Sequence, residues 1–361
     1  MRRPLEHRLR RGVMHVLAGV RSRGAARNGF RGAQRVLVVR AHNEVGDALI
    51  MTACLAALAK TARRPKIMVV CREKTEFVYE QNPHIGSLVV LEPSFARAHP
   101  IRAIGAMRRI RAFAPDVAVV PATISLSLFS TFVGLASGAG AISGGAGPPG
   151  GVYEGVRLPF DTVAAFPAGT HHAERNRLHF APLGVEKIAG REIFLTDSER
   201  EAGLAALADA GLGGRRPVLL LPGAGKAQNR WPVERFVEIG VQGARRRVPV
   251  AVSTGPGERE LGEALVAGLA ARKVRAAILD GLPWRTLAAV GELSRVWICN
   301  DTGVLHLGAA VGCPTVSVFG PTLASEWAPA GKKHVAIQAP TGRVADVPAA
   351  LVARAALPFL A

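Results

Sequence analysis

The chain has 361 residues, roughly twice the usual size of one domain, which favours two domains. Hydrophobic residues make up 49% and charged residues 20% of the chain, so it can bury sizeable cores and is not a disordered polyelectrolyte. Lys and Arg number 46 against 27 Asp and Glu, a formal charge of +19, and about half of this charge lies in residues 1–35, which contain ten arginines and one acid, Glu6.

Residues 1–34 form a basic arm ahead of the first expected strand. Its only apolar stretch, residues 12–20, contains His15 and is followed by further arginines, which is unlike the cleavage region of a signal peptide. We therefore expect the arm to be retained. The valines and leucine among its arginines are consistent with a short amphipathic segment on an anionic membrane surface, and a solvated tail is the alternative.

After the arm, short β-branched runs alternate with Ala- and Leu-rich stretches of helical period. The runs are apolar throughout rather than alternating, which is typical of strands buried on both faces of a parallel sheet. We predict strands at 36–40, 66–71, 87–91 and 117–121, and helices at 47–62, 74–81, 101–113 and 125–136.

Residues 117–153 carry no formal charge, which raises the question of a membrane span. Pro121 and several glycines interrupt the segment, and Ser and Thr are dense within it. A buried strand, a short helix and a flexible Gly/Pro-rich loop at 144–151 are the favoured interpretation.

The alternation resumes after a His-containing helix near 170–183. Further strands are predicted at 217–221, 248–253, 274–279, 296–300 and 315–319, with helices beginning at Pro232, Glu258, Arg285 and Gly303. The predicted fold is α/β, with two Rossmann-like, doubly wound parallel-sheet domains that face a cleft. The expected domains are 35–185 and 186–345, followed by a C-terminal helix within 346–361 that could pack back on the N-terminal domain.

The four cysteines, at positions 54, 71, 299 and 313, are scattered and form no C-x-x-C pair. This spacing favours small core residues in a reducing compartment over disulfides or a zinc site. A cytoplasmic location follows as an expectation.

The first motif, Gly46-Asp47, lies between the first strand and the first helix. Gly46 permits a tight turn, and Asp47 lies at a helix start on the expected cleft. The carboxylate could cap the helix by accepting from backbone N–H groups, or it could act as a general base for a hydroxyl.

Two further motifs follow strands of the second half. Residues 221–234 combine Gly223, Ala224 and Gly225, which let a ligand approach the backbone, with the cations Lys226 and Arg230, a combination that suits a phosphate. Residues 254–260 contain a Gly-Pro-Gly turn and then Glu258, which could cap the next helix or accept hydrogen bonds from a ribose.

The fourth motif, residues 299–306, runs from a buried strand directly into a helix. Free amides at the helix start, the Thr302 hydroxyl and Gly303 indicate a diphosphate site, because the positive end of a helix favours anions. His306 either faces the same ligand or is a core residue.

In order along the chain, these motifs resemble glycosyltransferase family 9, whose best-known members are the lipopolysaccharide heptosyltransferases. The resemblance extends from about residue 36 to residue 359. It rests on Gly46-Asp47, Pro222-Gly-Ala with Asn229-Arg-Trp-Pro232, Gly255-Pro-Gly-Glu258, Asn300-Asp-Thr-Gly303 with His306, and Phe319-Gly-Pro-Thr322 leading to Trp327-Ala-Pro329.

The resemblance implies a GT-B fold and a metal-independent, inverting glycosyltransferase. It would move a heptose-like sugar from a nucleotide diphosphate sugar, with an ADP-linked donor favoured, to a glycolipid or polysaccharide acceptor. The family's Gly-Asp aspartate, proposed as the catalytic base, corresponds to Asp47, with Arg40 and Gly46 beside it on the acceptor side. The implied donor-binding residues are Gly223, Ala224, Lys226, Asn229, Arg230, Glu258, Asp301, Thr302, Gly303 and His306.

The chain also departs from the family pattern. Many relatives have a lysine where this chain has Asn229, and Lys226 or Arg230 could replace it. A GT-B protein that binds nucleotide sugar without transferring it is therefore an alternative, and a related sugar epimerase lacks support from these motifs. A basic nucleic-acid binding protein is less favoured, because aromatic residues are only 5% and no recognition fold is apparent. We expect no metal, no other cofactor and no specific nucleic-acid partner, and a cytoplasmic protein that could be peripheral on the inner face of the cytoplasmic membrane.

Overall fold

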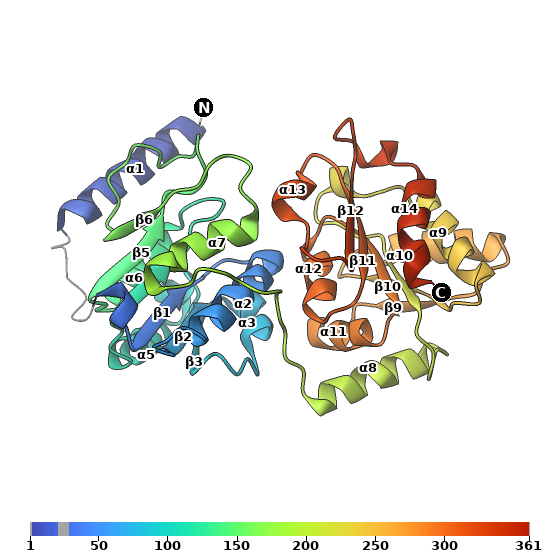
Figure 1. The fold of residues 1–361 in the computed structure, drawn as a ribbon, viewed down its shortest axis with the longest axis horizontal. Coiled ribbons are helices and arrows are strands. Elements are labelled where there is room, and N and C mark those ends of the chain that lie inside the picture. Colours follow the sequence, from blue (N-terminus) through green and yellow to red (C-terminus); the bar gives the residue numbers. More distant parts are fainter. Residues whose placement is uncertain (1, 21–28, 361) are drawn as a thin grey trace. The chain divides into compact units, whose positions relative to one another are not determined.

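The computed structural model describes residues 2–20 and 29–360, and the chain divides into two compact units, Met1–Gly190 and Arg191–Ala361 (Figure 1). The division falls close to the boundary expected after residue 185. Each unit is an α/β layer of its own, as the alternating pattern predicts. The expected cleft between the halves stays a prediction.

The described part of unit 1 contains a six-stranded sheet in the order β3-β2-β1-β4-β5-β6, with every pairing parallel. This is a doubly wound sheet, because the chain proceeds outwards from β1 in one direction and from β4 in the other. The strands are β1 (Arg35–Val39), β2 (Lys66–Cys71), β3 (Ser87–Val90), β4 (Val117–Val120), β5 (Ala141–Gly145) and β6 (Thr162–Ala164).

Helices flank this sheet (Figure 1). Three of the four helices predicted here, α2, α3 and α5, lie within a few residues of their expected bounds, while α6 begins three residues late, at Leu128, directly after its cap residue Ser127. The helices of unit 1 are α1 (Arg2–Val20), α2 (Val45–Ala59), α3 (Glu73–Tyr79), α4 (Phe95–Ala98), α5 (Pro100–Ala112), α6 (Leu128–Ala136) and α7 (His172–Phe180).

Strand β5 extends by two residues, Gly144 and Gly145, into the segment 144–151 that we expected to be a flexible loop. It is fully buried, although its sequence Ala-Ile-Ser-Gly-Gly is poor in β-forming residues. A Cβ atom at Gly144 would overlap the ring of Phe160, and one at Gly145 would lie 2.5 Å from Nε2 of His179. The two glycines therefore allow the side chains of Phe160 and His179 to pack closely against the strand, and they do not mark a loop.

The described part of unit 2 contains a second six-stranded parallel sheet, in the order β12-β11-β10-β7-β8-β9. It has the same doubly wound plan, with β7 and β10 adjacent at its centre. The strands are β7 (Val218–Leu221), β8 (Val250–Thr254), β9 (Ala276–Asp280), β10 (Val296–Asn300), β11 (Thr315–Phe319) and β12 (His334–Gln338). The helices are α8 (Asp197–Asp209), α9 (Val233–Arg245), α10 (Arg259–Ala271), α11 (Trp284–Glu292), α12 (Gly303–Ala310), α13 (Ala324–Trp327) and α14 (Ala349–Ala356).

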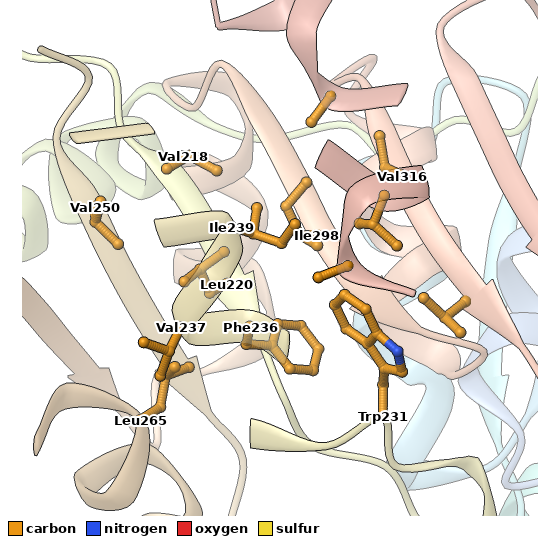
Figure 2. Close-up of a cluster of buried hydrophobic side chains, with 14 of the residues drawn as sticks. Val218, Leu220, Trp231, Phe236, Val237, Ile239, Val250, Leu265, Ile298 and Val316 are labelled. Atoms are coloured by element: carbon orange, nitrogen blue, oxygen red, sulfur yellow. The ribbon is translucent and has the colours of Figure 1, made fainter. Parts of the chain in front are cut away.

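The core of unit 2 joins the central strands to α9 and α14 (Figure 2). Trp231 packs edge to face on Phe236, with ring centroids 5.0 Å apart, and its indole N–H donates to the carbonyl of Val347 at 3.0 Å. We expected the C-terminal helix to be able to pack back on the N-terminal domain. The buried residues of α14, Val352 among them, instead belong to the core of unit 2, so the helix is part of that domain.

Helix α8 lies at residues 197–209, where no helix was predicted. Thr196 caps it, accepting from the backbone N–H of Glu199, and the Glu199 carboxylate accepts from the backbone N–H of Thr196 in return. This reciprocal capping box satisfies two donors at the helix start, and α8 packs on α11.

Most of the basic arm is ordered. Residues 2–20 form helix α1, whose Met14 side chain is fully buried in the core of unit 1, with Leu17 packed beside it. The alternative of a solvated tail is therefore wrong for this part of the arm, while residues 21–28 lie outside the described residues.

No helix within residues 2–20 or 29–360 has the length and hydropathy needed to cross a membrane. The uncharged segment 117–153 instead supplies β4, α6 and β5. All four cysteines are free thiols and buried, as predicted from their spacing.

Candidate functional site

The carboxyl ends of β1 and β4 form the switch point of unit 1. These adjacent strands connect onward in opposite directions, which opens a crevice where such sheets bind ligands. Arg40, directly after β1, spans the crevice: its Nη1 donates to the carbonyl of Pro121 at 3.3 Å and its Nη2 to the hydroxyl of Thr123 at 3.2 Å. The guanidinium thus fixes the two loops to each other.

Asp47 projects into the same place from the first turn of α2. One carboxylate oxygen, Oδ2, lies 2.8 Å from Nη2 of Arg40, and the other, Oδ1, lies 2.6 Å from Nε2 of His172. Asp47 is only 3% exposed and His172 is fully buried. Asp47 therefore has a cationic partner on one oxygen and an imidazole on the other.

The charges of this cluster can be assigned from the surroundings. Burial by itself would raise the pKa of Asp47, but the Arg40 cation, with a contribution from His172, lowers it far below its usual range. Burial lowers the pKa of His172 despite the neighbouring carboxylate. Near neutral pH the cluster is thus an ionised Asp47, a charged Arg40 and a neutral His172. Burial and the Arg40 charge also lower the pKa of His42, on the loop after β1, to about 4.

The structure excludes the capping role for Asp47. Glu44 is the N-cap residue of α2, and its side chain makes no capping hydrogen bond, while Asp47 lies inside the helix. Gly46 is a helical residue, partly exposed beside the carboxylate. Arg40, expected on the acceptor side, is 2% exposed and contacts Asp47 directly.

Helix α7 supplies the functional neighbours that the sequence motifs missed. His172, Arg175, Asn176 and His179 recur at helical spacing and are all buried, which gives α7 a polar face inside the unit. His179 links this face to the crevice, because its Nε2 accepts from the backbone N–H of Ala122 at 3.1 Å while Nδ1 lies 2.7 Å from the carbonyl of Arg175. The helical spacing of these polar residues is the one feature of the sequence that could have identified this face.

The switch point of unit 2 lies between β7 and β10, and Asn300 at the end of β10 organises it. Its Nδ2 donates to the carbonyls of Pro222 and Gly223 at 2.8 and 3.1 Å, and its Oδ1 accepts from the backbone N–H of Trp231 at 3.0 Å. One buried amide therefore holds both ends of the loop after β7. Arg230 also stabilises the loop, since its Nε donates to the carbonyl of Ala224 at 3.0 Å.

Glu258 lies directly over the start of that loop. Its carboxylate accepts from the backbone N–H of Gly255 at 3.1 Å. A Cβ atom at Gly223 would overlap the Glu258 carboxylate, so a larger residue there would require the Glu258 side chain to move. The structure thus brings the Pro-Gly-Ala and Gly-Pro-Gly-Glu motifs into contact, as expected of residues around one ligand.

The start of α12 carries the strongest indication of a ligand site in unit 2. Thr302 is the N-cap residue, yet it makes no capping hydrogen bond, and its buried hydroxyl has no hydrogen-bond partner among the described residues. A buried polar group without a partner is costly and calls for an explanation. Gly303 begins the helix, so the first amides of α12 adjoin this hydroxyl.

The charge of Lys226 acts on Asp301 at the same switch point. Burial raises the pKa of Asp301, while a hydrogen bond with Thr322 and the charge of Lys226 act in the opposite direction. Lys226 is exposed, whereas Asn229 is partly buried with its Oδ1 lacking a partner among the described residues. The exposed Lys226 therefore adds charge beside the α12 amides.

His306 is buried, and the structure gives it a partner that the motifs did not indicate. Its Nδ1 lies 2.6 Å from Nη1 of Arg191, whose pKa is lowered to about 10 by burial. Arg191 is the first residue of unit 2 and belongs to no motif, so only the fold could reveal the pair. Within the described residues, no group of three or more His, Cys, Asp or Glu side chains is placed to hold a metal ion.

The sequence profile of glycosyltransferase family 9 (heptosyltransferase) matches residues 144–350. Lipopolysaccharide heptosyltransferase 1 of Pseudomonas aeruginosa is 34% identical over 158 residues, which are 43% of this chain and 41% of that protein. The match thus spans less than half of that relative's length.

Solved structures match over nearly the whole chain. The family 9 glycosyl transferase of Veillonella parvula has a TM-score of 0.75 at 19% identity, covering 91% of this chain and 97% of its own. ADP-heptose lps heptosyltransferase II of E. coli has a TM-score of 0.70 at 17% identity, covering 90% and 98%. E. coli heptosyltransferase WaaC with ADP has a TM-score of 0.68 at 19% identity, covering 90% and 99%. These likenesses confirm the predicted GT-B fold.

Proposed function

The chain belongs to glycosyltransferase family 9, and we propose that it is a metal-independent, inverting glycosyltransferase that moves a heptose-like sugar from a nucleotide diphosphate sugar to a glycolipid or polysaccharide acceptor. The observation that carries the proposal is the crevice of unit 2. There Asn300 fixes the loop after β7 close to the start of α12, where the Thr302 hydroxyl has no partner among the described residues.

This crevice suits a diphosphate. The first amides of α12 and the positive end of its dipole favour an anion, and the Thr302 hydroxyl can donate to a phosphate oxygen. Lys226 supplies a full positive charge nearby, and the loop at 223–224 allows a ligand close to the backbone. On the far side of Gly223, Glu258 is placed to accept hydrogen bonds from a ribose.

The same groups would stabilise the leaving group during transfer. As the acceptor oxygen attacks the anomeric carbon, the bond from that carbon to the diphosphate breaks and its electron pair leaves with the nucleotide. Preorganised amides, a hydroxyl and a cation can stabilise the developing charge, which is usually the largest single contribution to catalysis. Because these groups can neutralise the leaving diphosphate, we propose that the transfer does not need a metal ion.

Asp47 would accept the proton of the attacking hydroxyl. It is ionised at neutral pH, and each carboxylate oxygen has two acceptor sites, so the contacts to Arg40 and His172 leave a further site on each oxygen. Its lowered pKa makes Asp47 a weak base, which suits a proton that leaves late, when the new bond is nearly formed.

An ADP-linked heptose is the donor we propose. WaaC of E. coli is described in structures with ADP and with ADP-2-deoxy-2-fluoro heptose, and the curated relative is a lipopolysaccharide heptosyltransferase. A lipid-linked acceptor would be met at a membrane surface, so the proposal includes a cytoplasmic protein that is peripheral on the inner face of the cytoplasmic membrane.

A second function, nucleotide-sugar binding without transfer, is favoured by Asn229 at the position of the family lysine and by the ion-paired state of Asp47. Incubation with radiolabelled ADP-heptose and a glycolipid acceptor, with and without EDTA, distinguishes the two. The proposal predicts labelled, inverted product and released ADP in both conditions. Tight donor binding without any turnover would favour the second function.

A further inference from the structure

Helix α1 has two apolar stripes on different sides. One stripe is internal: Met14 is fully buried, Ala18 is 5% exposed, and both face the core of unit 1. The guanidinium of Arg11 adds hydrogen bonds to the carbonyls of Val152 and Glu154, at 2.9 and 3.1 Å. The helix is therefore fixed to unit 1 along this side.

The second stripe faces outward. Leu9, Val13 and Val16 are 63%, 46% and 63% exposed, and their spacing of four and three residues places them on one face of the helix. Exposed apolar residues are common singly, but three in line on one helix form a continuous apolar surface. Figure 1 shows α1 along the outside of unit 1.

Charge accompanies this stripe. Helix α1 carries five arginines and a single acid, Glu6, which pairs with Arg10. Arg8 and His15 are also exposed, and helical spacing places them on the flank between this stripe and the buried face. An apolar stripe bordered by cations is the pattern of a helix that lies in the interface of an anionic bilayer.

We propose that the face formed by Leu9, Val13 and Val16 docks unit 1 on an anionic membrane surface, with α1 lying in the plane of the headgroups. A second copy of the chain is a poorer occupant, because it would bring two arginine-rich helices together. A nucleic acid would use the charges but not the aliphatic stripe, and α1 contains no aromatic residue for stacking on bases.

This inference deepens the proposed function, since a glycolipid acceptor lies in a membrane. Its test needs neither donor nor acceptor, so failure of the docking surface and failure of the transfer activity are distinguishable. The full-length protein is sedimented with vesicles of phosphatidylcholine alone or with phosphatidylglycerol added. We expect binding to the anionic vesicles that weakens as salt is raised.

The decisive variant replaces Leu9, Val13 and Val16 by Ser. The matched control replaces Leu204, Ile278 and Leu351 by Ser, because these unit 2 residues are 50%, 40% and 40% exposed. The triple change in α1 should weaken the vesicle partition at least about tenfold, and the control should not. Unchanged binding of the α1 variant would overturn the proposal. The proposal would also be overturned if wild type and control formed a dimer without vesicles and the α1 variant did not, since a second copy of the chain would then occupy this face.

A fluorescent label gives a readout that does not depend on a multiple variant. The four native cysteines are buried, so Val16→Cys can be labelled selectively with an environment-sensitive dye, and Leu204→Cys serves as the reference. Anionic vesicles should shift the emission of the dye at position 16 to the blue and leave the dye at position 204 unchanged. If the protein bound the vesicles and the emission of the dye at position 16 did not shift, the assignment of this face would be contradicted.

Discussion

The imidazole of His172 lies 2.6 Å from the carboxylate of Asp47, and both side chains are buried at the switch point of unit 1. The two residues come from different helices, Asp47 from α2 and His172 from α7. Arg40 contacts the other carboxylate oxygen, so the orientation of Asp47 is fixed from two sides. We interpret His172 as a positioning residue for the proposed base.

His172→Leu should lower kcat by about tenfold with little change in the KM for donor, because it removes one of the two groups that orient Asp47. His172→Gln, whose amide can still donate to the carboxylate, should retain most of the activity. Steady-state kinetics of both variants test this role. If the Leu and Gln variants were equally active, or equally impaired, the imidazole would not act by donating to Asp47.

Thr302→Val should weaken ADP binding about tenfold or more, because a hydrogen bond to a charged group is lost, while the thermal midpoint of the unliganded protein should not fall. The second expectation follows from the hydroxyl having no hydrogen-bond partner among the described residues, so its removal breaks no hydrogen bond seen in the structure. Thr302→Ser is the matched control and should bind ADP normally. Calorimetric titration measures the affinities; equal affinity in wild type and the Val variant would exclude Thr302 from the donor site.

Lys226→Ala should weaken ADP binding by a similar factor if Lys226 replaces the family lysine. The reverse change, Asn229→Lys, should strengthen binding, because it restores a cation where relatives have one. Lys187→Ala, at an exposed lysine outside unit 2, controls for net charge. ADP affinities measured at two salt concentrations check that the effect is electrostatic. If the Lys226→Ala variant binds ADP as tightly as the Lys187→Ala control, Lys226 does not contact the phosphate.

The folded protein should lose stability as the pH falls from about 6.5 to about 4. Burial lowers the pKa of His179 to about 4, whereas an unfolded histidine titrates near 6.5. Between these values the unfolded chain binds a proton that the folded chain excludes, so acid favours unfolding, by up to about 1.4 kcal/mol per pH unit for one histidine.

His179→Gln should reduce this slope by about one proton, since Gln can accept from the Ala122 N–H and donate to the Arg175 carbonyl without titrating. His99→Gln, at an exposed position, is the control and should leave the slope as it is. Urea unfolding at several pH values gives both slopes. If the free energy of unfolding of the His179→Gln protein depended on pH as steeply as that of wild type, another group would be responsible for the proton uptake.

Much of the fold is predictable from the sequence, because parallel strands buried on both faces are uninterrupted apolar runs. The bounds predicted for β2, β10 and β11 are those observed. β5 was missed because its glycines are set by close contacts with Phe160 and His179, which depend on the tertiary fold. α8 was missed although Thr196 and Glu199 carry the spacing of a capping box, a local signal that the sequence did contain.

The two halves of the candidate site differ in how well the sequence predicts them. The residues around the crevice of unit 2 lie in short loops after strands, so local motifs identify them and the sheet brings them together. Local motifs do not identify His172, which contacts Asp47, or Arg191, which contacts His306. His172 and Arg191 lie outside the motifs, and only long-range packing places them beside these side chains.

The most direct test of the proposed transfer measures single-turnover transfer of labelled heptose by wild type and Asp47→Asn, at saturating ADP-heptose, with ADP affinity measured in parallel. The substitution removes the proposed base and leaves Arg40 without its charged partner in unit 1, whereas the donor residues lie in unit 2. ADP affinity therefore reports whether the donor domain is intact. We predict unchanged ADP affinity and transfer slowed by at least about 10²-fold, in line with the loss of a general base. Transfer at the wild-type rate by a folded Asp47→Asn protein would contradict the assignment of Asp47 as the catalytic base.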